Sequence, residues 1–94
     1  MKLFREYFLD TTTHMEQTLY LPKDADIVKV NFTNKGLALL AIVTPEGCAT
    51  EFPELRTFKI CVNEENLYTD TIKYIGSFES NIGIKHLIEI IKET

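Results

Sequence analysis

Asp26–Pro45, with the sequence DIVKVNFTNKGLALLAIVTP, is the stretch that decides the fold. Its first half alternates between apolar and polar residues, as a strand with one buried and one solvated face does. The apolar positions are Val28, Val30 and Phe32. Asn34-Lys35-Gly36 holds residues that tolerate a positive φ, so the chain can reverse there at little cost. Residues 37–43 are apolar at every position, which is typical of a strand covered on both faces. The stretch therefore predicts a hairpin whose second strand is the centre of the core.

Patterns of the strand type recur on both sides of this hairpin, at spacings of about ten residues. The segments are 2–9, 17–21, 55–62 and 70–78. Pro22 ends the second of them, because proline cannot donate a hydrogen bond to a sheet, and Gly76 indicates a bulge or a close backbone approach. Residues 82–91 fit either an amphipathic helix or an isoleucine-rich strand. The expected fold is mainly β: a single small antiparallel sandwich or barrel of six to seven strands, with the C-terminal segment a strand or a short helix.

The length and composition indicate one globular domain over residues 1–94. The chain is 45% hydrophobic and 26% charged, which are ordinary values for a soluble protein and exclude a disordered or fibrous one. Arg5 and Glu6 interrupt the first apolar run, so no signal peptide is expected. No window approaches the ~20 apolar residues of a membrane span, so we expect a cytoplasmic protein without a membrane partner.

The charge and the cysteines exclude further classes of function. The formal net charge is −4, and this balance disfavours binding to nucleic acid phosphates. Cys48 and Cys61 lie outside any C-x-x-C pattern, so both are expected to be free thiols rather than zinc ligands or a disulfide.

Catalytic signatures are missing from the sequence. His14 is expected to be a solvated turn residue, and His86, in a run of isoleucines, a hydrogen-bonded packing residue. Neither serine lies in a nucleophile elbow, and the four glycines form no phosphate-binding loop. We therefore expect no enzyme, no cofactor and no metal.

Two acidic segments are candidates for binding a partner, because each sets an aromatic ring among carboxylates. A ring supplies buried area, and carboxylates steer a basic protein toward it. The alternative is that these rings cover the ends of the sandwich. The candidate residues are Glu51, Phe52, Glu54, Glu64, Glu65, Tyr68 and Asp70.

A small-ligand or nucleotide-binding module is the alternative function. Arg56, Lys59 and Lys73 lie on predicted strands, and basic side chains at a sandwich opening can meet phosphate groups.

Several further motifs resemble a family of short tailed-phage proteins of unknown function. The matching residues are Gln17-Thr18-Leu19-Tyr20-Leu21-Pro22, Ala41-Ile42-Val43-Thr44-Pro45, Arg56-Thr57-Phe58-Lys59-Ile60 and Tyr74-Ile75-Gly76-Ser77. The chain departs from the family in having Asn63-Glu64-Glu65-Asn66 in place of a Gly-Thr-Gly-His turn, and in lacking tryptophan.

The resemblance implies a phage or prophage accessory protein in the host bacterial cytosol. The expected function is binding to a host protein, with inhibition of a defence component as one form. A virion or assembly role is a further alternative, because free sheet edges in a small domain favour a homo-oligomer.

Overall fold

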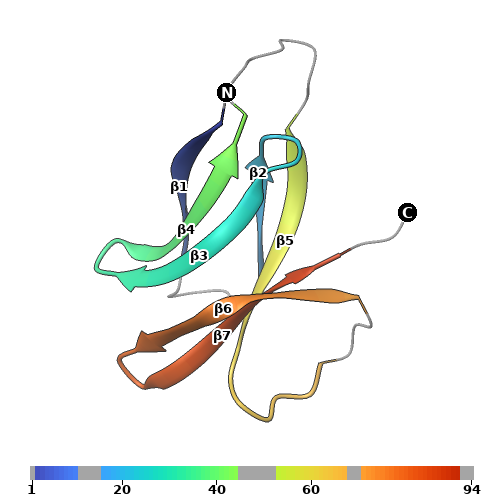
Figure 1. The fold of residues 1–94 in the computed structure, drawn as a ribbon. Coiled ribbons are helices and arrows are strands. Elements are labelled where there is room, and N and C mark those ends of the chain that lie inside the picture. Colours follow the sequence, from blue (N-terminus) through green and yellow to red (C-terminus); the bar gives the residue numbers. More distant parts are fainter. Residues whose placement is uncertain (1, 11–15, 45–52, 68–70, 92–94) are drawn as a thin grey trace.

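The computed structural model describes residues 2–10, 16–44, 53–67 and 71–91, and these form seven strands and no helix (Figure 1). The strands are β1 (Leu3–Leu9), β2 (Glu16–Leu21), β3 (Asp26–Thr33), β4 (Gly36–Val43), β5 (Glu54–Cys61), β6 (Ile72–Ser80) and β7 (Gly83–Ile90). Within the described residues there is accordingly no apolar helix of membrane-spanning length.

The strands form two antiparallel sheets around one core. One sheet has the order β1-β4-β3, and the other has the order β2-β5-β7-β6. Both sheets contribute to the core, which includes Leu39 from β4, Phe58 from β5 and Leu87 from β7. The predicted antiparallel sandwich is confirmed, and the barrel alternative is wrong because the described strands do not close into one sheet.

The central hairpin is confirmed as β3 and β4, which pair from Asp26↔Ile42 to Thr33↔Gly36. In the turn, the Thr33 hydroxyl donates to the Gly36 carbonyl at 2.7 Å and accepts from the Lys35 N–H at 3.2 Å. Gly36 has a φ of 119°, and a Cβ there would lie 2.8 Å from the carbonyl oxygen of Leu9. Only glycine fits this position without strain.

β4 supplies the centre of the core, as the sequence predicts. Leu37, Leu39 and Ala41 have no exposed surface, and they lie on the face that meets the second sheet. The opposite face is covered less completely, because Leu40 and Ile42 are only half-buried. The expectation that both faces of this strand are covered is therefore met fully on one face and in part on the other.

The prediction that Val28 belongs to the buried face of β3 is wrong. The register against β4 shifts between Ile27 and Lys29, so β3 carries one extra residue there. Ile27 and Val30 point into the core at 7% and 6% exposure, whereas Val28 is 43% exposed. The bulge turns the valine outward.

Residues 82–91, for which the sequence allowed a helix or a strand, contain β7. This strand lies between β5 and β6 in its sheet. A central strand satisfies its backbone polar groups on both sides, and β-branched side chains suit such a position. Its outward side chains are Ile84, His86, Ile88 and Ile90.

Gly76 is confirmed as the site of both a bulge and a close approach. The β6–β7 register shifts between Tyr74 and Gly76, and a Cβ on Gly76 would lie 3.0 Å from Cγ1 of Val30. β3 and β6 lie side by side here, and the rings of Phe32 and Phe78 stack with centroids 6.1 Å apart. This contact joins the two sheets along one edge.

The connection from β5 to β6 links two parallel strands, because each is antiparallel to β7, which lies between them. Two side-chain contacts hold it to the sheet. His86 Nε2 lies 2.6 Å from Asn63 Oδ1, and Lys59 Nζ lies 3.1 Å from Glu65 Oε2. His86 Nδ1 also lies 3.0 Å from the Tyr74 hydroxyl, so the prediction that His86 is a hydrogen-bonded packing residue is confirmed.

Candidate functional site

The acidic candidates from the sequence do not form one patch. Glu54 is the first residue of β5, whereas Glu64 and Glu65 follow the other end of that strand. The eight residues of β5 separate the two ends by about 26 Å, at roughly 3.3 Å per residue. Glu51, Phe52, Tyr68 and Asp70 lie outside the described residues.

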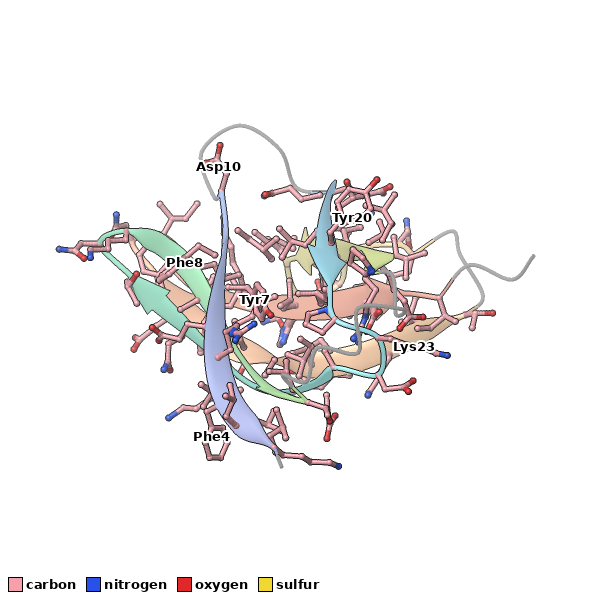
Figure 2. The ribbon with its side chains drawn as sticks, turned by 90° about the horizontal axis from the view of Figure 1, so that it is seen from above. Phe4, Tyr7, Phe8, Asp10, Tyr20 and Lys23 are labelled. Carbon is pink, nitrogen blue, oxygen red and sulfur yellow. The ribbon has the colours of Figure 1, made fainter. Side chains whose placement is uncertain are left out.

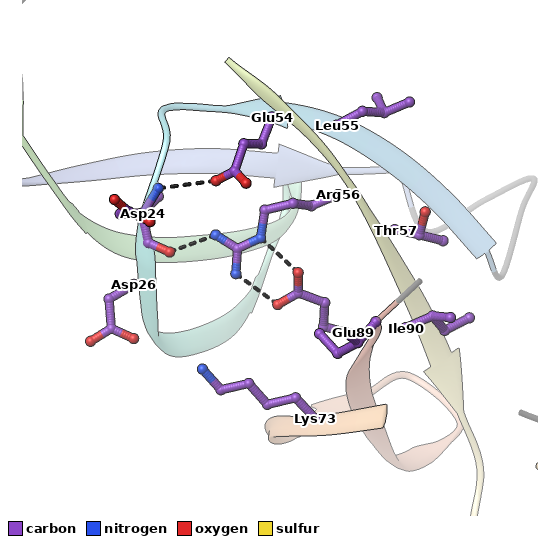
Figure 3. A pocket seen from close by; sticks show the side chains of 11 residues that line it. Asp24, Asp26, Glu54, Leu55, Arg56, Thr57, Lys73, Glu89 and Ile90 are labelled. Atoms are coloured by element: carbon purple, nitrogen blue, oxygen red, sulfur yellow. Dashed lines mark hydrogen bonds and ion pairs between the residues drawn. The ribbon is translucent and has the colours of Figure 1, made fainter. Parts of the chain in front are cut away.

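A cleft of about 560 Å³ opens at the end of the sandwich where β5 begins and β7 ends (Figure 3). The turn between β2 and β3 forms one wall. Six charged residues line the cleft: Asp24, Asp26, Glu54, Arg56, Lys73 and Glu89. We call this the acidic cleft, because its four carboxylates exceed its two basic groups and give it a formal charge of −2.

Arg56 lies at the centre of the acidic cleft, and each of its three guanidinium nitrogens donates a hydrogen bond (Figure 3). Nε and Nη2 donate to the two carboxylate oxygens of Glu89 at 2.6 and 2.7 Å, and Nη1 donates to the carbonyl oxygen of Ala25 at 2.5 Å. The pair is largely buried, with side-chain exposures of 15% for Arg56 and 6% for Glu89. The hydrogen bond to Glu89 raises the pKa of Arg56 despite desolvation by burial.

This geometry assigns Arg56 a positioning task rather than a ligand-binding one. Its bidentate pair with Glu89 ties β5 to β7, and the bond to Ala25 ties both strands to the turn before β3. A phosphate group that bound bidentately to Nε and Nη2 would have to displace the buried carboxylate of Glu89. That exchange leaves Glu89 charged and unpaired, so it is costly.

The wall formed by the β2–β3 turn is also fixed. Asp24 has a φ of 62°, a left-handed conformation that Asp tolerates better than most residues. Its N–H donates to Glu54 Oε1 at 3.0 Å, and the Ala25 N–H donates to the Pro22 carbonyl at 3.1 Å. The exposed carboxylates of Asp24 and Asp26 are therefore held at the rim by backbone geometry.

Exposed apolar side chains flank the acidic cleft. Leu55 and Ile91 line it and are 55% and 40% exposed. Tyr20 pairs with Leu55 across β2 and β5 and is 68% exposed. In Figure 2 its side chain stands away from the body of the ribbon. An apolar rim beside excess negative charge can bind a lysine or arginine side chain. The methylene groups pack against the apolar rim, and the charged group pairs with the carboxylates.

The remaining basic candidates occupy different positions. Lys73 lines the acidic cleft, and Figure 3 shows its side chain below the Arg56–Glu89 pair. Lys59 lies on the opposite face of β5, where Glu65 accepts its ion pair. The hydrogen bond to Glu65 raises the pKa of Lys59. The structure therefore brings Arg56 and Lys73 together and leaves Lys59 apart.

Glu64 and Glu65 lie in the turn that follows β5 and help to form it. Glu64 is exposed, with a φ of 66°. Glu65 Oε1 accepts from the Val62 N–H at 3.1 Å, and this bond, followed by the one to Lys59, lowers the pKa of Glu65. The polar turn predicted at residues 63–66 is confirmed.

The described part of the fold contains a cysteine and several possible metal ligands, namely His, Cys, Asp and Glu side chains, whose surroundings decide whether they can react or bind a metal. Cys61 is a buried free thiol, and burial raises its pKa, which lowers the fraction of nucleophilic thiolate. Within the part of the chain that is described, no three His, Cys, Asp or Glu side chains converge in a way that could hold a metal ion. Cys48 and His14 lie outside that part.

Sequence reasoning missed Asp24, Asp26 and Glu89. Asp24 and Asp26 stood in a segment that read only as a charged connection, and Glu89 stood in a segment that fitted two structures. Asp26 lies two residues from Asp24, on the strand that follows the turn, and this spacing was the available signal. The position of Glu89 depends on which strand lies beside β5, and no local pattern carries that information.

A second cavity, of about 1000 Å³, opens at the other end of β3, between the β3–β4 and β6–β7 hairpins. Its lining includes Ile60 and the stacked rings of Phe32 and Phe78. Lys35 and Lys85 also line it, and neither forms an ion pair with another described residue. We call this the hairpin cavity.

Comparisons with known proteins add no family to this picture. No family model matches the chain, and no curated protein or solved structure matches it.

Proposed function

We propose that this chain is a non-enzymatic interaction protein that binds a basic segment of another protein at the acidic cleft. The observation that carries the proposal is the excess of two carboxylates in a cleft of about 560 Å³ whose rim exposes Leu55 and Ile91. Because Glu89 already neutralises Arg56, the charge available to a partner is that of the rim. The rim carboxylates are Asp24, Asp26 and Glu54.

The phage resemblance of the sequence suggests the setting of this interaction. In this setting the protein acts in the cytosol of the host bacterium. Its partner is a host protein that it inhibits, such as a defence component. A rigid acidic cleft suits inhibition, because it can mask a basic patch that the host protein uses to bind nucleic acid. Electrostatic steering raises the association rate of such a pair and makes it sensitive to salt.

The test is capture from bacterial lysate with matched variants. Asp24→Asn combined with Asp26→Asn removes the excess charge and keeps a side chain that tolerates a positive φ at residue 24. Leu55→Ser removes an apolar part of the rim. We expect either variant to retain at least tenfold less of a specific partner than wild type, with capture falling as salt rises.

The matched control is Glu16→Gln combined with Glu79→Gln, two exposed acids that do not line the acidic cleft. It removes the same charge and is expected to capture the partner normally. Equal capture by wild type, the cleft variants and the control would contradict the proposal. Urea unfolding of each variant checks that the fold is retained.

Binding of a small anionic ligand at the hairpin cavity is the second candidate function. The favouring observation is the combination of Lys35 and Lys85 with the stacked rings of Phe32 and Phe78, since anionic groups and flat apolar bodies can be held together there. A thermal-shift screen with nucleotides tests it, because ligand at 100 times its dissociation constant adds about 2.7 kcal/mol of stability.

The shift is expected to vanish in the Lys35→Ala, Lys85→Ala double variant and to persist in Lys2→Ala, which changes an exposed lysine outside both cavities. The absence of any shift with wild type would remove this candidate.

A further inference from the structure

The outer face of the β1-β4-β3 sheet is apolar yet lies open. Leu40 and Ile42 of β4 point to this face and are half-buried, whereas Leu37, Leu39 and Ala41 on the other face have no exposed surface. The second sheet covers only that other face, which holds the core residues. β4 therefore has the composition of a strand covered on both faces and the environment of a strand covered on one.

The neighbouring strands extend this apolar surface. Phe4 and Phe8 of β1 are 65% and 44% exposed, and Val28, turned outward by the bulge in β3, is 43% exposed. Figure 2 places Phe4 and Phe8 on one side of β1 and Tyr7, which packs against the core, on the other. Three strands of about eight residues span roughly 14 by 26 Å, or about 370 Å². The apolar side chains share this area with Glu6, Asp26 and Lys29, and the largest apolar patch of a typical monomer, about 300–600 Å², is often functional.

The middle row of this face carries an acid and a base on opposite sides of β4. Glu6 of β1 pairs with Leu40, and Leu40 pairs with Lys29 of β3, so the three residues form one row across the sheet. The acid and the base thus stand on opposite sides of the apolar centre. Neither forms an ion pair with another described residue.

We propose that this face is the interface of a two-fold symmetric dimer of the chain. A two-fold axis that lies in the interface along β4 and passes over Leu40 places Glu6 opposite the partner subunit's Lys29. The symmetry repeats the pair, with Lys29 opposite the partner subunit's Glu6. An axis along the row would place Glu6 opposite its own copy and Lys29 opposite its own copy, which like charges oppose. The charges therefore select one orientation.

A second copy fits this face better than an unrelated protein. The middle row of the face carries one acid and one base, and Asp26, opposite Ile42, adds one carboxylate at the end next to the acidic cleft. An isologous interface must be complementary to itself, and the row Glu6–Leu40–Lys29 has that property. The patch is smaller than the roughly 800 Å² per partner of a tight complex, so the dimer is expected to dissociate in the micromolar range.

Sedimentation equilibrium of the purified chain between 5 and 500 µM tests the proposal. Wild type is expected to change from monomer to dimer over this range. Glu6→Lys and Lys29→Glu each place like charges opposite one another, and each is expected to weaken association at least tenfold. The double variant restores opposite charges and should dimerise like wild type.

Mixing the two single variants gives a sharper result. In the mixed dimer every charged pair is again of opposite sign, so the mixture should associate although neither variant does so alone. Glu79→Lys and Lys35→Glu, which lie outside the face, are the matched controls and should not alter association. Equal urea midpoints show that the variants are folded.

Three outcomes would overturn the dimer. They are a wild-type chain that stays monomeric at 500 µM, single variants that associate as wild type does, and a double variant that fails to recover. Association that ignores the charge changes would instead indicate pairing through a free strand edge. The proposed function has a separate readout, because Leu55→Ser changes β5 of the other sheet and is expected to weaken partner capture at least tenfold and leave the dimer intact.

Discussion

Arg56 and Glu89 show how one residue pair can shape a surface without taking part in its binding. Their bidentate contact is nearly dry, and the third guanidinium nitrogen holds the β2–β3 turn through Ala25. Removing one partner leaves a charge in the interior with nothing to neutralise it. Replacing both by apolar groups removes that cost together with the attraction.

Glu89→Leu is therefore expected to lower the free energy of unfolding by about 3 kcal/mol, the lower end for a buried pair. The Arg56→Met, Glu89→Leu double variant should recover most of that loss. Urea unfolding with a constant m-value measures both. Lys73→Met, which changes an exposed lysine of the same cleft, is the control and should move stability by less than about 0.5 kcal/mol. A double variant as unstable as Glu89→Leu would contradict this account.

The sequence predicted part of the candidate site at this scale. Glu54 was identified as a carboxylate near an aromatic ring in an acidic loop, and Arg56 and Lys73 were identified as basic residues on predicted strands. Glu89 was missed because its importance comes from Arg56, which lies 33 residues earlier in the chain. The two residues meet only because β7 lies beside β5, and that pairing is a property of the sheet.

At the scale of elements, the bulge in β3 decides which valine belongs to the core. A period of two assigns Val28 and Val30 to one face, and one inserted residue breaks that rule. The bulge leaves Val30 in contact with Gly76 at the joint between the sheets and gives Val28 to the outer face. The same pattern predicted β5 correctly, because the described register of β5 contains no shift.

Val30→Ala is expected to lower the free energy of unfolding by about 2 kcal/mol, because it removes two buried methyl groups. Val28→Ala, the matched change on the same strand, should lower it by less than about 0.5 kcal/mol in the monomer. Urea unfolding at 5 µM, well below the concentration at which the dimer is expected to form, measures the two differences. Equal losses would indicate that the strand has the unbroken period that the sequence suggested.

β7 illustrates the opposite case, in which the surroundings choose between two local patterns. Residues 84–91 carry a helical stripe and a strand face at the same time. The segment forms a strand because its backbone can then form hydrogen bonds with both β5 and β6. A helix in its place would leave the backbone groups of β5 and β6 unpaired. No local pattern in the sequence indicates which strands will lie on either side of this segment.

At the scale of the whole molecule, the fold is organised by contacts between segments far apart in the chain. The β3–β4 hairpin is local and was predicted from its turn residues and alternation, whereas the β6–β7 hairpin was not predicted. The arrangement of strands in the second sheet, β2-β5-β7-β6, was not, because it joins residues 16–21 to residues 54–61 and places β7 between two earlier strands. Both cavities and the open outer face arise at this level.

The place of β7 also fixes the order in which the molecule can be built during synthesis. When β6 leaves the ribosome, β7 is still inside it, so the position between β5 and β6 in the finished sheet is vacant. Until β7, the last of the described strands, pairs with β5, one edge of β5 therefore has no hydrogen-bonding partner. In that interval the unpaired edge and apolar side chains of β5 are exposed, and such surfaces favour aggregation.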